Sequence, residues 1–94
     1  MPEVRVIVGS RIGLHARPAA LLAKAAKGPL SVRIARGSGA SVDASSVLAV
    51  MGLGVGAGEE VVLSADGEGA DAKLAELAAL VARDLDATES VRND

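Results

Sequence analysis

Residues 13–43 read GLHARPAALLAKAAKGPLSVRIARGSGASVD, and this stretch decides the fold. Small apolar residues recur in it at helical spacing: Ala19, Leu22, Ala23 and Ala26. They predict a helix over 16–27, which ends at a glycine followed by a proline. Alternating apolar residues then predict a strand over 30–34, and the glycines at 37–39 turn the chain back into a short strand over 40–43. A helix followed by a β-hairpin indicates a mixed α/β domain.

The flanking segments extend this pattern in both directions. Valines alternate up to residue 8 and predict a first strand that Gly9 and Ser10 end. The run over 47–51 has strand propensity, but Ser46 before it favours a short helix capped by the serine hydroxyl. Residues 60–65 predict the fourth strand. A last helix is predicted from about residue 70 by apolar residues on one face: Leu74, Leu77, Ala78, Val81 and Leu85.

Strands that alternate apolar and polar residues are typical of a mainly antiparallel sheet with one face covered by helices. We therefore expect an α/β (α+β) open-faced two-layer sandwich, in which a four-stranded, mainly antiparallel sheet carries three helices on one face. The chain of 94 residues provides enough apolar surface for one core. We expect a single domain over 1–85 and a polar, mobile tail over 86–94.

Composition excludes several classes of function. The net charge of -2, the pI near 5.3 and the lack of aromatic residues argue against nucleic-acid binding. The chain has no cysteine, so disulfides and thiolate chemistry are excluded, and a single histidine argues against a zinc site. The longest uncharged stretch, 44–58, is too short and too rich in glycine to span a membrane. We expect a cytoplasmic protein without metal, cofactor or membrane insertion.

His15 is the only histidine, and it stands directly before the predicted helix start at Ala16. The first amides of a helix lack acceptors within the helix and carry partial positive charge, which makes this end a natural anion site. The donors would be chiefly the backbone amides of Ala16 and Arg17, and the Arg17 guanidinium adds a planar cation. Pro18 fits because proline is tolerated in the first turn. A phosphoryl group on His15 would meet ready donors.

More ordinary interpretations exist for these residues. A lone histidine is usually a surface or hydrogen-bonded residue, and an arginine is often simply solvated. Arg17, however, would lie in a first turn, where a cation opposes the helix dipole. That mildly unfavourable placement favours an anionic partner.

Three features together resemble the histidine-containing phosphocarrier (HPr) family of the bacterial phosphoenolpyruvate:sugar phosphotransferase system. They are the GLHARPA segment at 13–19, the SVLAVMGLG segment at 46–54 and the order of the elements. The resemblance covers the chain from Val4 to about Leu85. It implies that His15 takes a phosphoryl group on Nδ1 from phosphorylated enzyme I and passes it to sugar-specific IIA components, that Arg17 helps to hold the phosphate, and that no cofactor is needed.

The resemblance also assigns regulatory and docking roles. Ser46 matches the serine that a dedicated HPr kinase/phosphorylase modifies in many Gram-positive members. The family's partner-binding positions correspond to Ala20, Lys24, Lys27, Val47, Leu48 and Met51. The last three would otherwise serve the core, as in most short amphipathic helices, and we expect them to be shared between both uses. Ile12 and Gly52 depart from the small polar residue and the polar side chain that are common at these positions.

The primary hypothesis is thus a monomeric phosphocarrier that is covalently phosphorylated but is not an enzyme that turns over alone. The alternative from another class is a regulatory binding module of the same fold, whose phosphorylation state signals to a transcriptional regulator or an enzyme. A third possibility, an unrelated α/β structural domain, would make GLHARPA a coincidence. The sequence leaves the choice between the sugar branch and the nitrogen-related branch open.

Overall fold

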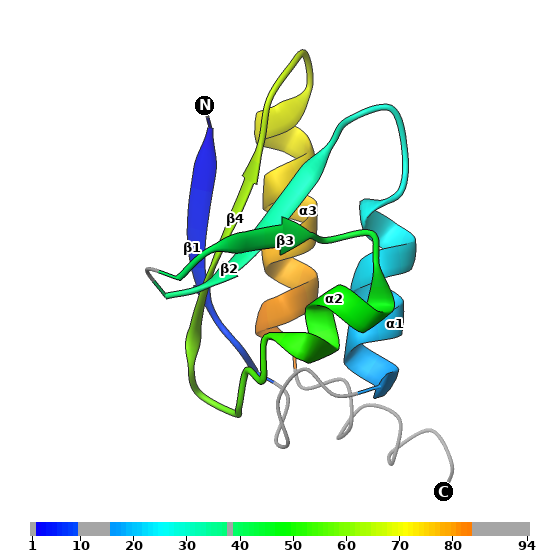
Figure 1. Cartoon of the computed structure of the whole chain (residues 1–94). Coiled ribbons are helices and arrows are strands. Elements are labelled where there is room, and N and C mark those ends of the chain that lie inside the picture. The colour runs from blue at the N-terminus through cyan, green and yellow to red at the C-terminus, as the bar shows by residue number, and fades with distance from the viewer. Residues whose placement is uncertain (1, 10–15, 38, 84–94) are drawn as a thin grey trace, which may run out of the picture.

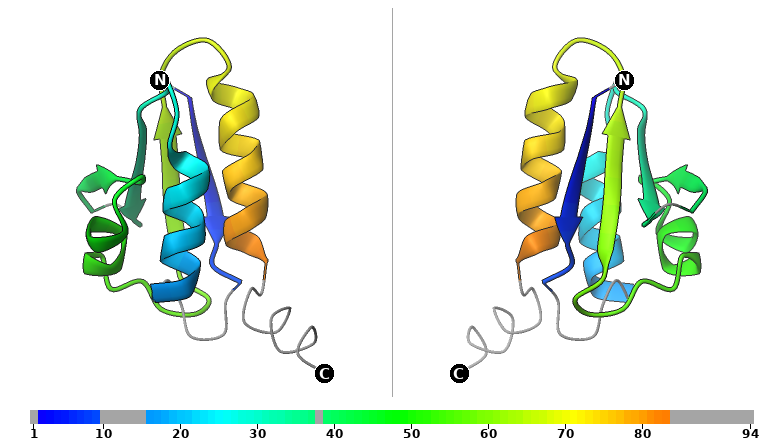
Figure 2. Two further views of the ribbon diagram at one scale, coloured as in Figure 1. Left: turned by 90° about the vertical axis from the view of Figure 1, so that its right-hand side faces the viewer. Right: turned by 90° about the vertical axis from the view of Figure 1, so that its left-hand side faces the viewer.

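The computed structural model describes residues 2–9, 16–37 and 39–83. The elements follow in the order β1 (Glu3–Ile7), α1 (Ala16–Ala26), β2 (Val32–Arg36), β3 (Ser41–Asp43), α2 (Val47–Gly52), β4 (Glu60–Ala65) and α3 (Ala70–Ala82) (Figure 1). The sheet has the strand order β1-β4-β2-β3, and its three pairings are all antiparallel. The helices cover one face (Figure 2). This arrangement confirms the predicted fold class.

β4 lies in the middle of the sheet and shows why the sequence alternates. Val61, Leu63 and Ala65 are buried, whereas the residues between them are only partly buried. Leu63 pairs with Val4 of β1 on one side and with Ile34 of β2 on the other. Because successive side chains of a strand point to opposite faces, this register directs one apolar set toward the helices.

The core is built without aromatic rings. Its largest fully buried side chains are Leu22, Ile34, Leu63, Leu77, Val50, Val61 and Pro18. Burying an aliphatic side chain of this size stabilises the fold by about 1.5–3 kcal/mol relative to exposure. The predicted stripe of small residues on α1 is buried as expected, from Ala19 to Ala26.

The element boundaries differ from the sequence predictions by one to a few residues. β2 begins at Val32 rather than at residue 30, because its pairing with β4 begins at the Val32–Ala65 pair and the preceding residues form a bend. α1 ends at Ala26, and the Lys27 amide bonds to the Lys24 carbonyl three residues back. α3 ends at Ala82. The predicted continuation to residue 85 and the predicted tail lie outside the described residues.

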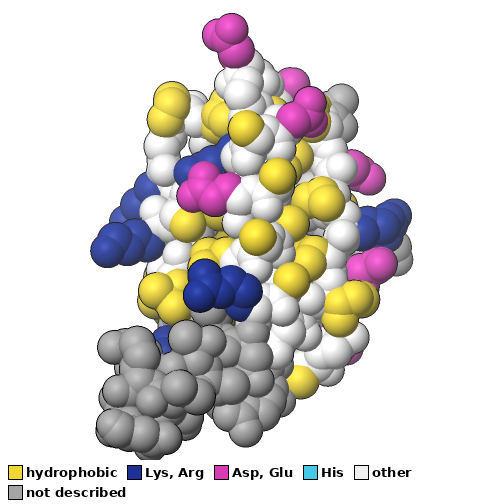
Figure 3. Space-filling view, turned by 180° about the vertical axis from the view of Figure 1, so that it is seen from behind, with side chains coloured by type: hydrophobic (Ala, Val, Ile, Leu, Met, Phe, Trp, Pro, Cys, Tyr) yellow, Lys and Arg dark blue, Asp and Glu magenta, His cyan; other side chains and the backbone are white. Residues whose placement is uncertain are grey.

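Figure 3 shows the side of the molecule that α3 covers. Small hydrophobic side chains are scattered among polar ones, and acidic side chains lie toward the end at which α3 begins. Among the described residues, the large hydrophobic side chains that are exposed belong to β1, α1 and α2: Ile7, Leu21, Leu48 and Met51. The exposed surface of α1 and α2 is therefore the place to look for partner contacts.

Candidate functional site

The start of α1 lies where the sequence predicts it. Ala16 is the first residue of the helix, so His15, which lies outside the described residues, comes directly before it in the chain. The amides of a first helical turn point back along the chain toward the preceding residue. The anion site proposed for Ala16 and Arg17 therefore has the helix end that it requires.

Arg17 and Pro18 occupy the first turn of α1 in different environments. The Arg17 side chain is exposed, whereas Pro18 is fully buried. The first turn of α1 contains no acidic residue. Pro18 fixes the backbone angle φ at the helix start and packs into the core. The sequence thus combines a rigid helix start with an exposed cation.

Ser46 is the N-cap of α2, as predicted. Its backbone is extended, with φ -104° and ψ 113°, and its Oγ accepts a hydrogen bond from the Ala49 amide at 3.2 Å. The preceding turn is held by Asp43, whose carboxylate accepts bonds from the Ser45 amide at 2.9 Å and the Ser45 hydroxyl at 2.7 Å. These bonds from Ser45 lower the pKa of Asp43 below its ordinary value. The prediction of a short helix for the run after Ser46 is confirmed.

The predicted partner-binding residues come from two helices that pack against each other (Figure 1). Ala20 and Lys24 on α1, and Lys27 directly after its end, are exposed. On α2, the exposed fraction is 83% for Leu48 and 39% for Met51, whereas Val47 is partly buried against the core. The buried member of α2 is Val50. The expectation that α2 is shared between core and surface agrees with this division.

Leu21 adds an exposed apolar residue that the sequence reasoning missed. Its exposed fraction is 42%, and it lies one turn after Arg17 on α1. The signal was available, because Leu21 is a leucine outside the buried stripe of this helix. Gly52, which departs from the family pattern, is exposed at the end of α2, and a Cβ there would meet nothing within 4 Å. Ile12 lies outside the described residues.

The loop that joins α2 to β4 is held by one carboxylate. Glu59 accepts a hydrogen bond from the Gly56 amide at 2.7 Å on Oε1 and from Arg36 Nη2 at 2.8 Å on Oε2. The Gly56 bond first, and then the Arg36 bond, lower the pKa of Glu59. Glu59 thus links two parts of this loop through Gly56 and links the loop to the end of β2 through Arg36.

The Glu59 bonds predict a pH dependence of stability. Because the folded-state pKa lies below the ordinary value of 4.5, the carboxylate stabilises the fold above that pH, and the stabilisation is lost as the pH falls through the folded-state pKa. Glu59→Gln is expected to lower the urea midpoint at pH 7 and to converge with the unsubstituted protein in acid. Glu68→Gln, at an exposed turn, is the control. A Glu59→Gln deficit that persists unchanged at pH 3 would contradict this account.

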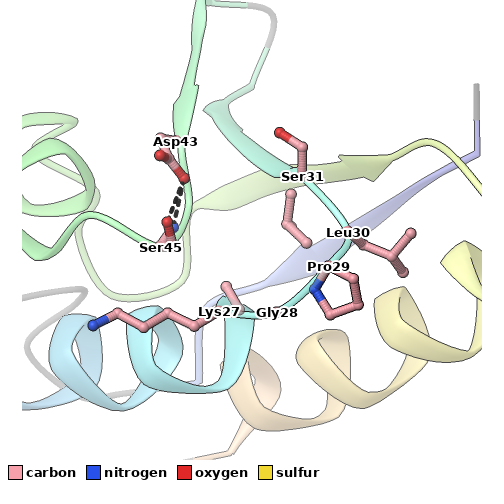
Figure 4. A pocket seen from close by; sticks show the side chains of 9 residues that line it. Lys27, Gly28, Pro29, Leu30, Ser31, Asp43 and Ser45 are labelled. Atoms are coloured by element: carbon pink, nitrogen blue, oxygen red, sulfur yellow. Dashed lines mark hydrogen bonds between the residues drawn. The ribbon is translucent and has the colours of Figure 1, made fainter.

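A hollow of about 350 Å³ lies at the opposite end of α1 from Ala16. The end of α1 and the start of β2 form one side, and the turn before α2 forms the other (Figure 4). In Figure 4, Asp43 and Ser45 bond to each other on one side of the hollow, and the segment from Lys27 to Ser31 runs along the other side. The helix of 11 residues is about 16 Å long, so this hollow is separate from the helix start.

Over residues 2–9, 16–37 and 39–83, no three His, Cys, Asp or Glu residues gather as metal ligands. Within these ranges no helix has the length and apolar character needed to cross a bilayer.

Comparison with known proteins identifies the family. A family model described as the PTS HPr component phosphorylation site matches residues 2–83. This chain belongs to the HPr family. HPr proteins are the phosphocarriers of the phosphotransferase system. The matched range contains both the GLHARPA segment and the helix that begins at Ala16.

Relatives support the assignment in sequence and in structure. The phosphocarrier protein HPr of Streptomyces coelicolor is 52% identical over 87 residues, which is 92% of this chain and 94% of the relative. The HPr crystal structure from Bacillus anthracis superimposes with a TM-score of 0.78 at 34% identity, covering 85% of this chain and 95% of that one. The Bacillus subtilis catabolite repression protein Crh, described as a dimer with a swapped domain, gives 0.66 at 39% identity, covering 86% and 93%.

Proposed function

We propose that this HPr family member carries a phosphoryl group on His15, taking it from phosphorylated enzyme I and passing it to IIA components of sugar permeases. The observation that supports this most strongly is the family match across 2–83, which spans the only histidine of the chain. We also propose a cytoplasmic location, because the phosphoryl donor derives from the cytoplasmic metabolite phosphoenolpyruvate. The protein acts as a covalent carrier and needs its partners to complete a cycle.

The chemistry of transfer matches the residues around the helix start. Neutral imidazole, whose ordinary pKa is about 6.5, is nucleophilic near pH 7. The Nδ1 lone pair forms the new N–P bond while the bond between phosphorus and the donor breaks and its electron pair returns to the donor. The Arg17 guanidinium and the amides of Ala16 and Arg17 hold the phosphoryl oxygens. The carrier thereby supplies position and charge, which are what phosphoryl transfer chiefly requires.

Docking is assigned to the surface that α1 and α2 share. The proposed contacts are Ala20, Lys24, Lys27, Val47, Leu48 and Met51, and we add Leu21 because it is an exposed apolar residue of α1. Exposed leucine and methionine side chains suit a carrier that meets several partners, because methionine adapts to different surfaces. The lysines favour partners with acidic rims around an apolar centre.

The direct test of the relay uses three purified components. The chain is incubated with enzyme I and labelled phosphoenolpyruvate, and a IIA component is then added. The label is expected to appear first on this chain and then to move to IIA. Absence of label on the chain, with an enzyme I that labels another HPr protein in the same preparation, would refute the carrier function.

A second function is favoured by the similarity to Crh, a protein described by its part in catabolite repression. In this alternative, HPr kinase/phosphorylase modifies Ser46, and the product signals to a transcriptional regulator. A phosphate on Ser46 would add about -1.5 to -2 charges close to the exposed Leu48 and Met51. It would weaken docking through α2 while a regulator that reads the phosphate gains a contact.

Three variants separate the capping role of Ser46 from this regulatory role. Ser46→Ala is expected to lower the free energy of unfolding by about 1 kcal/mol, because it removes the acceptor for the Ala49 amide. Ser46→Asn and Ser46→Asp both keep a cap, but only the aspartate adds charge. Ser46→Asp is therefore expected to slow uptake of label from enzyme I relative to Ser46→Asn. Equal rates for the Asn and Asp variants would argue against regulation by charge at Ser46.

A further inference from the structure

The side chains of Arg36 and Glu59 form a clamp between the end of β2 and the loop that follows α2. One oxygen of the Glu59 carboxylate accepts from Arg36 Nη2 at 2.8 Å, and the other accepts from the Gly56 amide at 2.7 Å. Hydrogen bonds to a charged group are stronger than those between neutral groups. Because the two oxygens have different partners, the carboxylate holds the strand and the loop together.

The guanidinium of Arg36 also lies next to the residue on which α2 ends its last hydrogen bond. A Cβ built on Gly54 would lie 3.8 Å from Arg36 Nη1, which is an ordinary contact distance. Gly54 itself donates its amide to the Met51 carbonyl at 3.1 Å. Met51 is one of the proposed docking residues of α2, and its side chain is exposed. Contacts between described residues thus lead from Glu59 to the last turn of α2.

The other anchors of α2 hold its start and its inner face. Ser46 caps the first turn, and Val50 is buried in the core. After the helix, Val55 returns to the core. A helix of 6 residues depends on such contacts, because so short a helix is marginal by itself. The clamp supplies the contact at the end of the helix, where Met51 is exposed.

We propose that Arg36 and Glu59 are positioning residues for partner docking, because their clamp holds the last turn of α2, with Met51, in the orientation that partners bind. The proposal rests on the proposed carrier function. Neither residue is among the proposed docking contacts. The backbone of Glu59 is held separately, since its carbonyl accepts from the Val8 amide at 2.9 Å and its amide bonds to the Gly56 carbonyl at 3.2 Å. Loss of the side chain alone therefore leaves these bonds in place.

The test compares Glu59→Ala with Glu60→Ala. Glu60 is a matched control, because its side chain has a similar exposed fraction, 43% against 38%, and pairs with an arginine, Arg5, at 3.1 Å. Both variants lose one negative charge and one ion pair, but Arg5 lies on β1. At a temperature where all variants are folded, Glu59→Ala is expected to raise KM for enzyme I by about two- to fivefold with kcat unchanged. Glu60→Ala is expected to leave both constants unchanged.

Met51 provides a direct readout of the orientation of α2. The chain has two methionines, Met1 and Met51, so labelling the methionine ε-methyl groups with ¹³C places one reporter on α2. The Met51 methyl resonance is expected to shift in Glu59→Ala and to stay in place in Glu60→Ala. An unchanged Met51 resonance in Glu59→Ala, or an equal shift in both variants, would overturn the positioning role. A shifted resonance with an unchanged KM would show that docking does not depend on the clamp, and would overturn it as well.

Arg36→Ala tests the same clamp from its other side. Because Arg36 acts together with Glu59, the double variant is expected to raise KM no further than either single variant does. Effects on KM that multiply would contradict a shared clamp. The Met51 resonance is recorded without any phosphoryl donor. If it shifts as expected while even the unsubstituted protein takes up no label, the clamp still orients α2 and the carrier function is refuted.

Discussion

His15→Ala is expected to abolish acid-labile labelling of the chain by enzyme I and phosphoenolpyruvate, with a loss of at least about a thousandfold. The reason is chemical, because the imidazole provides the only nitrogen nucleophile of its kind in a chain with one histidine and no cysteine. The hydroxyls and carboxylates that remain do not form a phosphoramidate. Label is measured after gel separation, before and after mild acid.

The labelling experiment needs a variant that keeps the histidine. Ser46→Asn retains a cap on α2 and is expected to take up label normally, as a variant that is substituted but keeps the histidine. The His15→Ala protein is expected to show the circular dichroism spectrum of the unsubstituted chain. Acid-labile label that persists in a folded His15→Ala protein would place the phosphoryl group elsewhere.

Leu48→Glu is expected to raise KM for enzyme I by about ten- to a hundredfold and to leave kcat and stability nearly unchanged. The exposed fraction of Leu48 is 83%, so the fold of the chain itself gains little from this side chain. Burying a leucine against a partner contributes about 1.5–3 kcal/mol, which corresponds to this range in affinity. A carboxylate at the same place must in addition lose its hydration when the partner docks.

Ile7→Glu is the matched control for the docking prediction. Ile7 is a large hydrophobic residue with an exposed fraction of 53%, and it lies on β1 rather than on α1 or α2. The same change of charge and polarity at Ile7 is expected to leave KM within about twofold of the unsubstituted value. Equal increases of KM in both variants would indicate an effect of net charge rather than of docking through α2.

Much of this fold follows from periodicity in the sequence. The buried stripe of α1 follows from Ala19 and its partners at helical spacing, and β4 follows from alternation over 60–65. Ser46 correctly predicted a helix rather than a strand for the run that follows it. Its hydroxyl accepts a hydrogen bond from an amide of the first helical turn. Local chemistry of this kind is present in the sequence itself.

The sequence could not predict features that depend on distant segments. β2 begins at Val32 because its antiparallel pairing with β4 begins at the Val32–Ala65 pair. No local signal in the sequence marks Val32 as the first residue of the strand. Gly9 reads as an ordinary strand end, and only the position of Ala82 in space shows why a glycine is needed there. Glu59, in the loop before β4, likewise gains part of its role from Arg36 at the end of β2. Tertiary contacts of this kind join segments that are far apart in the sequence, and no local sequence pattern predicts them.

For the candidate site, the sequence predicted the residue types and the helix start but not which apolar side chains are exposed. Val47 and Leu48 are neighbours of similar character, yet one packs against the core and the other is exposed. α2 packs against α1 and β3, and periodicity over a helix of 6 residues does not fix which of its side chains meet the core.

The most direct measurement of the central claim is the site of phosphoryl attachment, observed by phosphorus and nitrogen NMR on the chain labelled with ¹⁵N and phosphorylated by enzyme I. The carrier account predicts a single phosphorus resonance coupled to Nδ1 of His15, which disappears when a IIA component is added. A phosphorus resonance coupled to no imidazole nitrogen, or an imidazole that stays unmodified while the donor is consumed, would contradict it.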